Sequence, residues 1–199
     1  MASDSYDITP FFSYRNGAWW RFRDQSTNGI VRVDCTELTA NRIQLKQTGA
    51  NNNAEHILES RPTEVHGQPA LQYTWLQSTI NGQTAHWVDG LSMPNPWQTG
   101  VSVSAISKEP NPATGNAVKL TIELHGDLMY KPPKGSPFHE PIHAIKLGQT
   151  VVDSKLGTKL ANATTIFGFS AGMIEVTGQN FGTPVVLRLE DWSGLHSRP

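Results

Sequence analysis

Apolar and polar side chains alternate along most of this chain. In residues 118–125 every second side chain is Val, Leu or Ile, and the side chains between them are Lys, Thr, Glu and His. The same alternation recurs in residues 31–36, 42–46, 71–75 and 185–190. Because successive side chains of a β-strand point to opposite faces, the pattern predicts strands with one buried and one solvated face. Such strands are typical of antiparallel sheets, since strands of parallel sheets are apolar throughout.

Turn residues separate the predicted strands. Asn81-Gly82 lies between two alternating segments and is the strongest hairpin signal, because both central positions of a type I′ turn need a positive φ. The chain has 17 glycines and 13 prolines, more than a helical protein tolerates. We therefore expect helix only in short pieces near residues 8–13 and 141–147.

Residues 1–199 are predicted to form one all-β domain with about ten or eleven strands. Its fold is an antiparallel barrel or, as the alternative, a two-sheet β-sandwich such as a jelly roll. Two proline-rich segments, residues 91–100 and 130–141, are expected to be loops, because Pro cannot donate to a strand ladder. They either cap a pocket or connect sheets.

The start of the chain resembles the calycin superfamily, which comprises the lipocalins and their intracellular relatives. A short apolar segment at residues 7–12 precedes Gly17-Ala18-Trp19, and the resemblance covers about 15 of the 199 residues. It implies an up-and-down barrel in which the Trp plugs one end and the other end opens to a ligand. It also implies a basic residue that packs on this Trp, for which Arg188 is the candidate.

Aromatic residues occupy alternate positions in several predicted strands. Such side chains form either a solid core or the wall of a cavity, and Trp is costly as core filler because its N–H needs a partner. Small residues such as Gly168 and Ala171 leave room for a guest molecule. The predicted ligand-binding residues are Trp20, Phe22, Trp75, Trp87, Phe167 and Phe169.

Glu175, His86 and Tyr73 are the candidate catalytic residues. Glu175 lies between Ile174 and Val176, and if its face were interior, burial would raise its pKa and make it a proton donor or base. If that face met water, Glu175 and likewise His86 would be ordinary surface groups. Other titratable residues in or beside apolar strands are Glu55, His56, Glu64 and Asp89.

Residues 139–143 read His-Glu-Pro-Ile-His, which matches the H-E-x-x-H pattern of zinc peptidases. In those sites both histidines lie on one helix. Pro141 disfavours a helix through this segment, and in an extended segment the two histidines lie roughly 13 Å apart. We therefore expect a polar loop leading into a strand. Whether His139 and His143 bind a metal stays open.

Composition excludes several classes of protein. Lys and Arg total 16 and Asp and Glu 17, so the formal net charge of -1 gives no long-range attraction to nucleic acid. Cys35 is the one cysteine, which rules out an intrachain disulfide and is expected to be buried in a strand. The first ten residues do not resemble a signal peptide, and no apolar run is long enough for a membrane span. A cytoplasmic setting is expected, and without a dinucleotide fingerprint or P-loop no cofactor is expected.

Three functions are compatible with these features. The first is a cofactor-independent cyclase or isomerase of secondary metabolism that folds a hydrophobic substrate against aromatic walls. The second is a non-catalytic binding protein for a hydrophobic ligand or pigment. The third is a lectin-like interaction sandwich that uses an exposed Trp97 and the loop at residues 48–53. Each of these functions is compatible with a homodimer.

Overall fold

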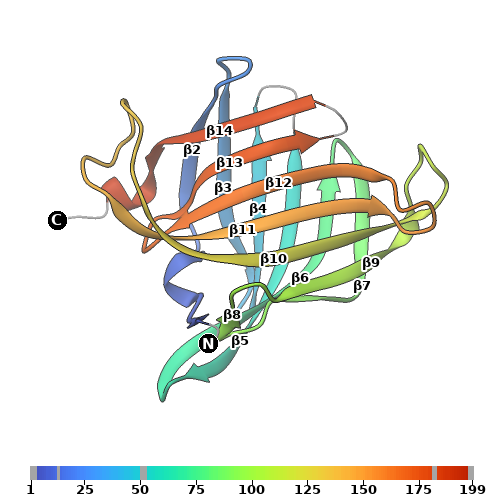
Figure 1. The fold of residues 1–199 in the computed structure, drawn as a ribbon, viewed down its shortest axis with the longest axis horizontal. Helices are drawn as coiled ribbons and strands as arrows, with labels where there is room; N and C mark the ends of the chain where they lie inside the picture. The colour runs from blue at the N-terminus through green and yellow to red at the C-terminus, as the bar shows by residue number, and fades with distance from the viewer. Residues whose placement is uncertain (1–3, 13, 50–52, 181–182, 197–199) are drawn as a thin grey trace.

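The computed structural model describes residues 4–12, 14–49, 53–180 and 183–196, and within these ranges twelve antiparallel strands form one closed barrel (Figure 1). Each barrel strand pairs with the next barrel strand along the chain, β7 pairs with β9 because β8 lies outside the ring, β9 pairs with β10, and β14 pairs with β2 to close it. The barrel strands are β2 (Trp19–Asp24), β3 (Ile30–Thr39), β4 (Arg42–Thr48), β5 (Ala54–Val65), β6 (Gln68–Ile80), β7 (Gln83–Ser92), β9 (Ser102–Pro110), β10 (Ala117–Tyr130), β11 (Ile142–Asp153), β12 (Lys159–Gly168), β13 (Gly172–Asn180) and β14 (Thr183–Trp192).

The predicted all-β antiparallel barrel is confirmed, and the chain does not form the alternative two-sheet sandwich. The expected number of strands was too low, because weakly apolar strands such as β12, with Ala and Thr on its inner face, give little alternation signal. Lipocalin barrels have eight strands. The calycin resemblance itself stays a prediction.

The alternation of the sequence sets the inside and outside of the barrel. Val118, Leu120, Ile122 and Leu124 of β10 are all buried, and the polar residues between them face outward. Cys35 is buried in β3, as predicted. Burial of these inward-facing apolar side chains is the main stabilising contribution, at about 25 cal/mol per Å² of apolar surface.

The hairpin prediction is confirmed and one helix prediction is wrong. Asn81 and Gly82 have φ values of 50° and 81°, as a type I′ turn between β6 and β7 requires. In the first predicted helical piece, Thr9–Phe11 forms the short 3-10 helix η1. The second, at residues 141–147, is instead extended, because β11 begins at Ile142 and pairs with β10 and β12 along its length.

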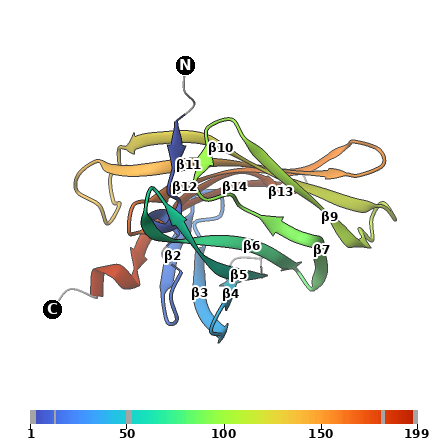
Figure 2. The same ribbon diagram turned by 90° about the horizontal axis from the view of Figure 1, so that it is seen from below.

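The N-terminal segment lies across the lower end of the barrel (Figures 1 and 2). Its first residues form β1 (Ser5–Tyr6), which pairs with β8 (Trp97–Gln98), and η1 follows. The side-chain nitrogen of Asn95 lies 3.0 Å from Asp7 Oδ1, 3.0 Å from Thr9 Oγ1 and 2.9 Å from the Leu71 carbonyl oxygen. This amide therefore fastens the segment to β6.

The second proline-rich segment, residues 130–141, connects β10 to β11 outside the barrel. Phe138 packs on Trp192 with ring centroids 4.8 Å apart, next to the short 3-10 helix η2 (Ser193–His196). Tyr130 donates a hydrogen bond to Glu175 Oε2 at 3.0 Å. This segment is thus a connector against β13 and β14 and does not cap the interior.

Among the residues with described structure, no helix has both the length and the apolar character needed to cross a membrane.

Candidate functional site

A cavity of about 610 Å³ lies inside the barrel. Pockets of roughly 300–1,000 Å³ hold small organic molecules. The cavity is bounded by inward-facing residues of most barrel strands, and exposed residues such as Gln83 and Pro112 line it at the β6–β7 and β9–β10 turns. It therefore opens at the end of the barrel that carries these turns.

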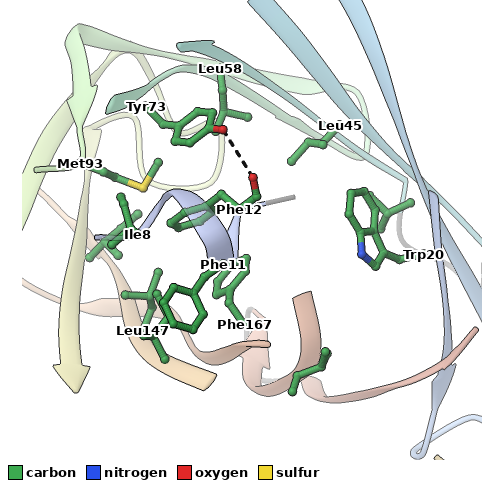
Figure 3. Packing of buried hydrophobic residues seen from close by; sticks show 14 of the residues in the cluster. Ile8, Phe11, Phe12, Trp20, Leu45, Leu58, Tyr73, Met93, Leu147 and Phe167 are labelled. Atoms are coloured by element: carbon green, nitrogen blue, oxygen red, sulfur yellow. Dashed lines mark hydrogen bonds between the residues drawn. The ribbon is translucent and has the colours of Figure 1, made fainter. Parts of the chain in front are cut away.

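Aromatic residues form the floor of the cavity at the opposite end (Figure 3). Phe12 follows η1 and packs between Tyr73 and Phe167, with ring centroids 5.6 Å and 4.7 Å away. The Tyr73 hydroxyl donates to the Phe12 carbonyl oxygen at 3.4 Å. Trp20 completes the floor from β2, and its indole N–H donates to the Ala171 carbonyl oxygen at 2.6 Å.

Small side chains on the walls leave the space that the cavity occupies. Ala54, Ala85, Ala161, Ala163 and Gly178 all line it, on strands that face each other across the barrel. A barrel of twelve strands is wider than the eight-stranded barrels that side chains just fill. Small residues at these positions therefore leave an interior that the larger wall residues do not close.

His56 is a polar group on the cavity wall. It faces inward from β5, its Nδ1 lies 3.1 Å from Ser78 Oγ, and its ring stands edge-on to Trp75 at 4.9 Å. Burial lowers the pKa of His56 to about 4, because the apolar surroundings disfavour the charged form. The imidazole is therefore neutral at pH 7, and no hydrogen bond to its Nε2 is made by the described residues.

Tyr14 is a second polar group of the cavity, at the floor. Its ring stands edge-on to Trp20 and Tyr73, with centroids 6.1 Å and 5.7 Å away. Burial, and then the neighbouring Tyr73 and Cys35, raise the pKa of its hydroxyl above the ordinary value. Within the described part of the chain this hydroxyl has no hydrogen-bond partner.

The cavity is nearly free of charge. Glu109 is the charged residue among those that line it, and neither Lys nor Arg occurs among the described lining residues. Hydrogen bonds from the His86 backbone N–H and imidazole lower the pKa of Glu109, which accepts both at 2.7 Å and 2.6 Å. This pair lies beside the opening rather than at the floor.

Four of the six predicted ligand-binding residues line the cavity, namely Trp20, Trp75, Trp87 and Phe167. Phe22 is fully buried next to them without lining the cavity, and Tyr73 supports the floor from behind Phe12. Burial raises the pKa of Tyr73 to about 12. The structure thus brings the predicted Trp residues together around one space.

The other predicted site residues lie away from the cavity, and these placements are corrections. Phe169 is 52% exposed, because β12 ends at Gly168 and the alternation ends with it. A register shift pairs Phe167 with Met173 but Ile166 with Glu175, so Glu175 faces outward. There it meets Tyr130 and lies 3.6 Å from Arg188.

His86 also points outward, toward Glu109. Trp97, expected at the surface in the lectin-like alternative, is fully buried in β8, where it pairs with Tyr6 of β1. The guanidinium carbon of Arg32 lies 4.9 Å from the ring centroid of Trp19, and Arg188, the candidate for that contact, lies next to Glu175. Of the predicted loop at residues 48–53, positions 50–52 fall outside the described residues.

Sequence reasoning named His56 only among the titratable residues beside apolar strands, not as a site residue, and it did not name Tyr14. His56 carries a readable signal, since Ala54, His56 and Leu58 occupy alternate positions of one strand and His56 therefore shares their inner face. Tyr14 carries none, because it lies in the irregular segment before β2 and its position depends on distant rings.

The His139–His143 motif is not helical, as predicted. His143 belongs to β11 and its Nε2 lies 3.1 Å from Asp127 Oδ2, while the other carboxylate oxygen, Asp127 Oδ1, accepts a hydrogen bond from the Tyr6 hydroxyl at 2.8 Å. His139 and Glu140 are exposed in the preceding loop. Over the residues with described structure, no group of three or more His, Cys, Asp or Glu side chains is arranged to hold a metal ion.

Comparisons with known proteins do not identify a family. Neither protein-family models nor curated proteins match the chain. Among solved structures, a Bacteroides fragilis protein with a YmcC-like fold matches 92% of this chain and 99% of its own, with 9% sequence identity and a TM-score of 0.41. So low a score carries no argument about fold or function.

Proposed function

We propose that the protein binds an uncharged, largely apolar small molecule inside its barrel. The observation that supports this most directly is the cavity of about 610 Å³, lined by Trp20, Trp75, Trp87 and Phe167 and open at one end. Burying an apolar guest against such walls contributes about 25 cal/mol per Å² of apolar surface removed from water. The walls are preformed by strands, so little ordering cost opposes binding.

The charge of the cavity restricts the ligand to neutral molecules. A carboxylate or phosphate taken into a low-dielectric interior loses hydration that only a paired cation replaces. Without Lys or Arg among the described lining residues, an anion has no such partner. Fatty acids and phosphorylated metabolites are therefore disfavoured relative to uncharged molecules of similar size.

Binding is tested with diphenylhexatriene, an uncharged apolar probe whose fluorescence rises in a dry site. Ala163→Phe fills the cavity from β12, and Thr164→Phe puts the same ring on the outer face of the same strand. We expect Ala163→Phe to weaken binding at least about tenfold, which corresponds to about 1.4 kcal/mol. Thr164→Phe should leave the affinity unchanged, and equal affinities for both variants would contradict an internal site.

A cofactor-free isomerase or cyclase is the second candidate, and His56 favours it. A neutral imidazole in an apolar cavity, hydrogen-bonded to Ser78, is suited to take a proton from one carbon of a bound substrate and return it to another. Such a shift moves a double bond without an oxidant or a second reactant. Glu175 and His86, which face away from the cavity, are not assigned this role.

The enzyme hypothesis is tested by deuterium exchange. β-Ionone, a neutral enone with acidic carbon-bound protons, is incubated with the protein in heavy water and its deuterium content is followed by mass spectrometry. We expect His56→Gln to abolish protein-dependent exchange while diphenylhexatriene still binds. Exchange that persists in His56→Gln, or that never exceeds the rate in buffer, would contradict the enzyme hypothesis and leave only the binding function.

A further inference from the structure

The hydroxyl and indole groups at the cavity floor differ in whether they have a hydrogen-bond partner within the protein. Trp20 Nε1 donates to the Ala171 carbonyl oxygen, and Tyr73 Oη donates to the Phe12 carbonyl oxygen. Tyr14 Oη makes no hydrogen bond with any described residue, although Tyr14 lines the cavity. A polar group in so apolar a place stays costly until something accepts its proton.

Trp87 differs from Tyr14 in how accessible its polar atom is to a guest molecule. Its Nε1 also lacks a partner among the described residues, but that atom is completely covered by the wall. Tyr14 is half-buried and lines the cavity, so part of its accessible surface faces the cavity. Tyr14 is therefore the better placed of the two to meet a guest molecule.

Three rings hold Tyr14 in one orientation. Trp20 and Tyr73 stand edge-on to it at interplanar angles of 87° and 83°, and Phe12 packs on it with a centroid distance of 5.5 Å. A phenol fixed in this way has lost its rotational freedom before a ligand arrives. The raised pKa of Tyr14 keeps the proton on the oxygen, so the group remains a donor at neutral pH.

We propose, on the basis of the proposed binding function, that the ligand carries an uncharged oxygen at its deep end, and that this oxygen accepts a hydrogen bond from the Tyr14 hydroxyl. The ligand class is then an apolar alcohol, ketone, aldehyde or ester rather than a pure hydrocarbon or a carboxylate. The apolar part fills the space below the β6–β7 and β9–β10 turns, and the oxygen lies at the floor beside Trp20.

Three molecules with one carbon skeleton test the inference. Farnesene is a hydrocarbon, farnesol carries a neutral hydroxyl and farnesoate a carboxylate, and each is titrated against bound diphenylhexatriene. Because farnesene is intrinsically the most apolar, the informative quantity is the affinity ratio of farnesol to farnesene. We expect Tyr14→Phe to lower this ratio about fivefold to tenfold, because only farnesol loses a hydrogen bond in the variant.

Tyr130→Phe is the matched control, because it removes a hydroxyl that contacts Glu175 outside the barrel. We expect it to keep the wild-type ratio. An unchanged ratio in Tyr14→Phe, or tightest binding by farnesoate, would overturn the inference and leave the cavity function standing. If neither diphenylhexatriene nor any of the three molecules binds, both the inference and the proposed function fail.

Discussion

His56 makes stability depend on pH at the scale of one residue. Its pKa of about 4 in the fold lies below the ordinary value of 6.5, so between these values the unfolded chain binds a proton that the folded protein does not. Stability is therefore lost as pH falls from 6.5 toward 4, by at most about 3 kcal/mol from this group. Urea unfolding at pH 7, 5.5 and 4.5 measures the loss.

His56→Gln keeps a side chain that can bond Ser78 but does not titrate. We expect the loss of stability between pH 7 and 4.5 to be smaller in this variant than in the wild type. His125→Gln, at an exposed position, is the control and should follow the wild-type curve. If His56→Gln loses as much stability as the wild type, the imidazole is not held neutral by its surroundings.

The N-terminal segment is the element on which the floor depends. Asn95 accepts a hydrogen bond from the Ile8 backbone N–H at 3.1 Å and donates to acceptors on Asp7, Thr9 and Leu71. Asn95→Ala removes all four hydrogen bonds, although Asp7 still accepts from the Thr9 N–H and Thr9 Oγ1 from the Leu71 N–H. A buried group that loses its partner costs about 1–3 kcal/mol. We expect a loss of about 2–4 kcal/mol in urea unfolding and weaker probe binding, because Phe12 is positioned by this segment.

Gln98→Ala is the comparison variant, since Gln98 is exposed on the neighbouring β8. Its free energy of unfolding should stay within about 0.5 kcal/mol of the wild type. An Asn95→Ala protein as stable as Gln98→Ala would mean that the floor is held by its aromatic contacts alone.

What the sequence predicts at this scale follows from how local each feature is. Alternation is a property of one strand, so Trp20, Trp75, Trp87 and Phe167 could be assigned to the inner face without knowing any partner. The register shift that turns Glu175 outward depends on how β12 pairs with β13, and the sequence of β13 contains no signal for this pairing. Tyr14 enters the cavity through contacts with β2 and β6, and such contacts between distant residues leave no periodic signal.

The whole barrel carries an unfilled interior, and this has a consequence for its stability. An added side chain usually strains a packed core, but a phenyl ring fits within about 610 Å³ and gains apolar contacts. Ala163→Phe without ligand should therefore be as stable as the wild type or more stable. Diphenylhexatriene at 100 times the wild-type Kd should stabilise the wild type by about 2.7 kcal/mol and the variant, which binds at least about tenfold more weakly, by at most about 1.4 kcal/mol. Thermal unfolding with and without probe separates the two effects. A variant destabilised by more than about 2 kcal/mol would mean that β12 packs against a filled interior, because overpacking carries a cost of that size.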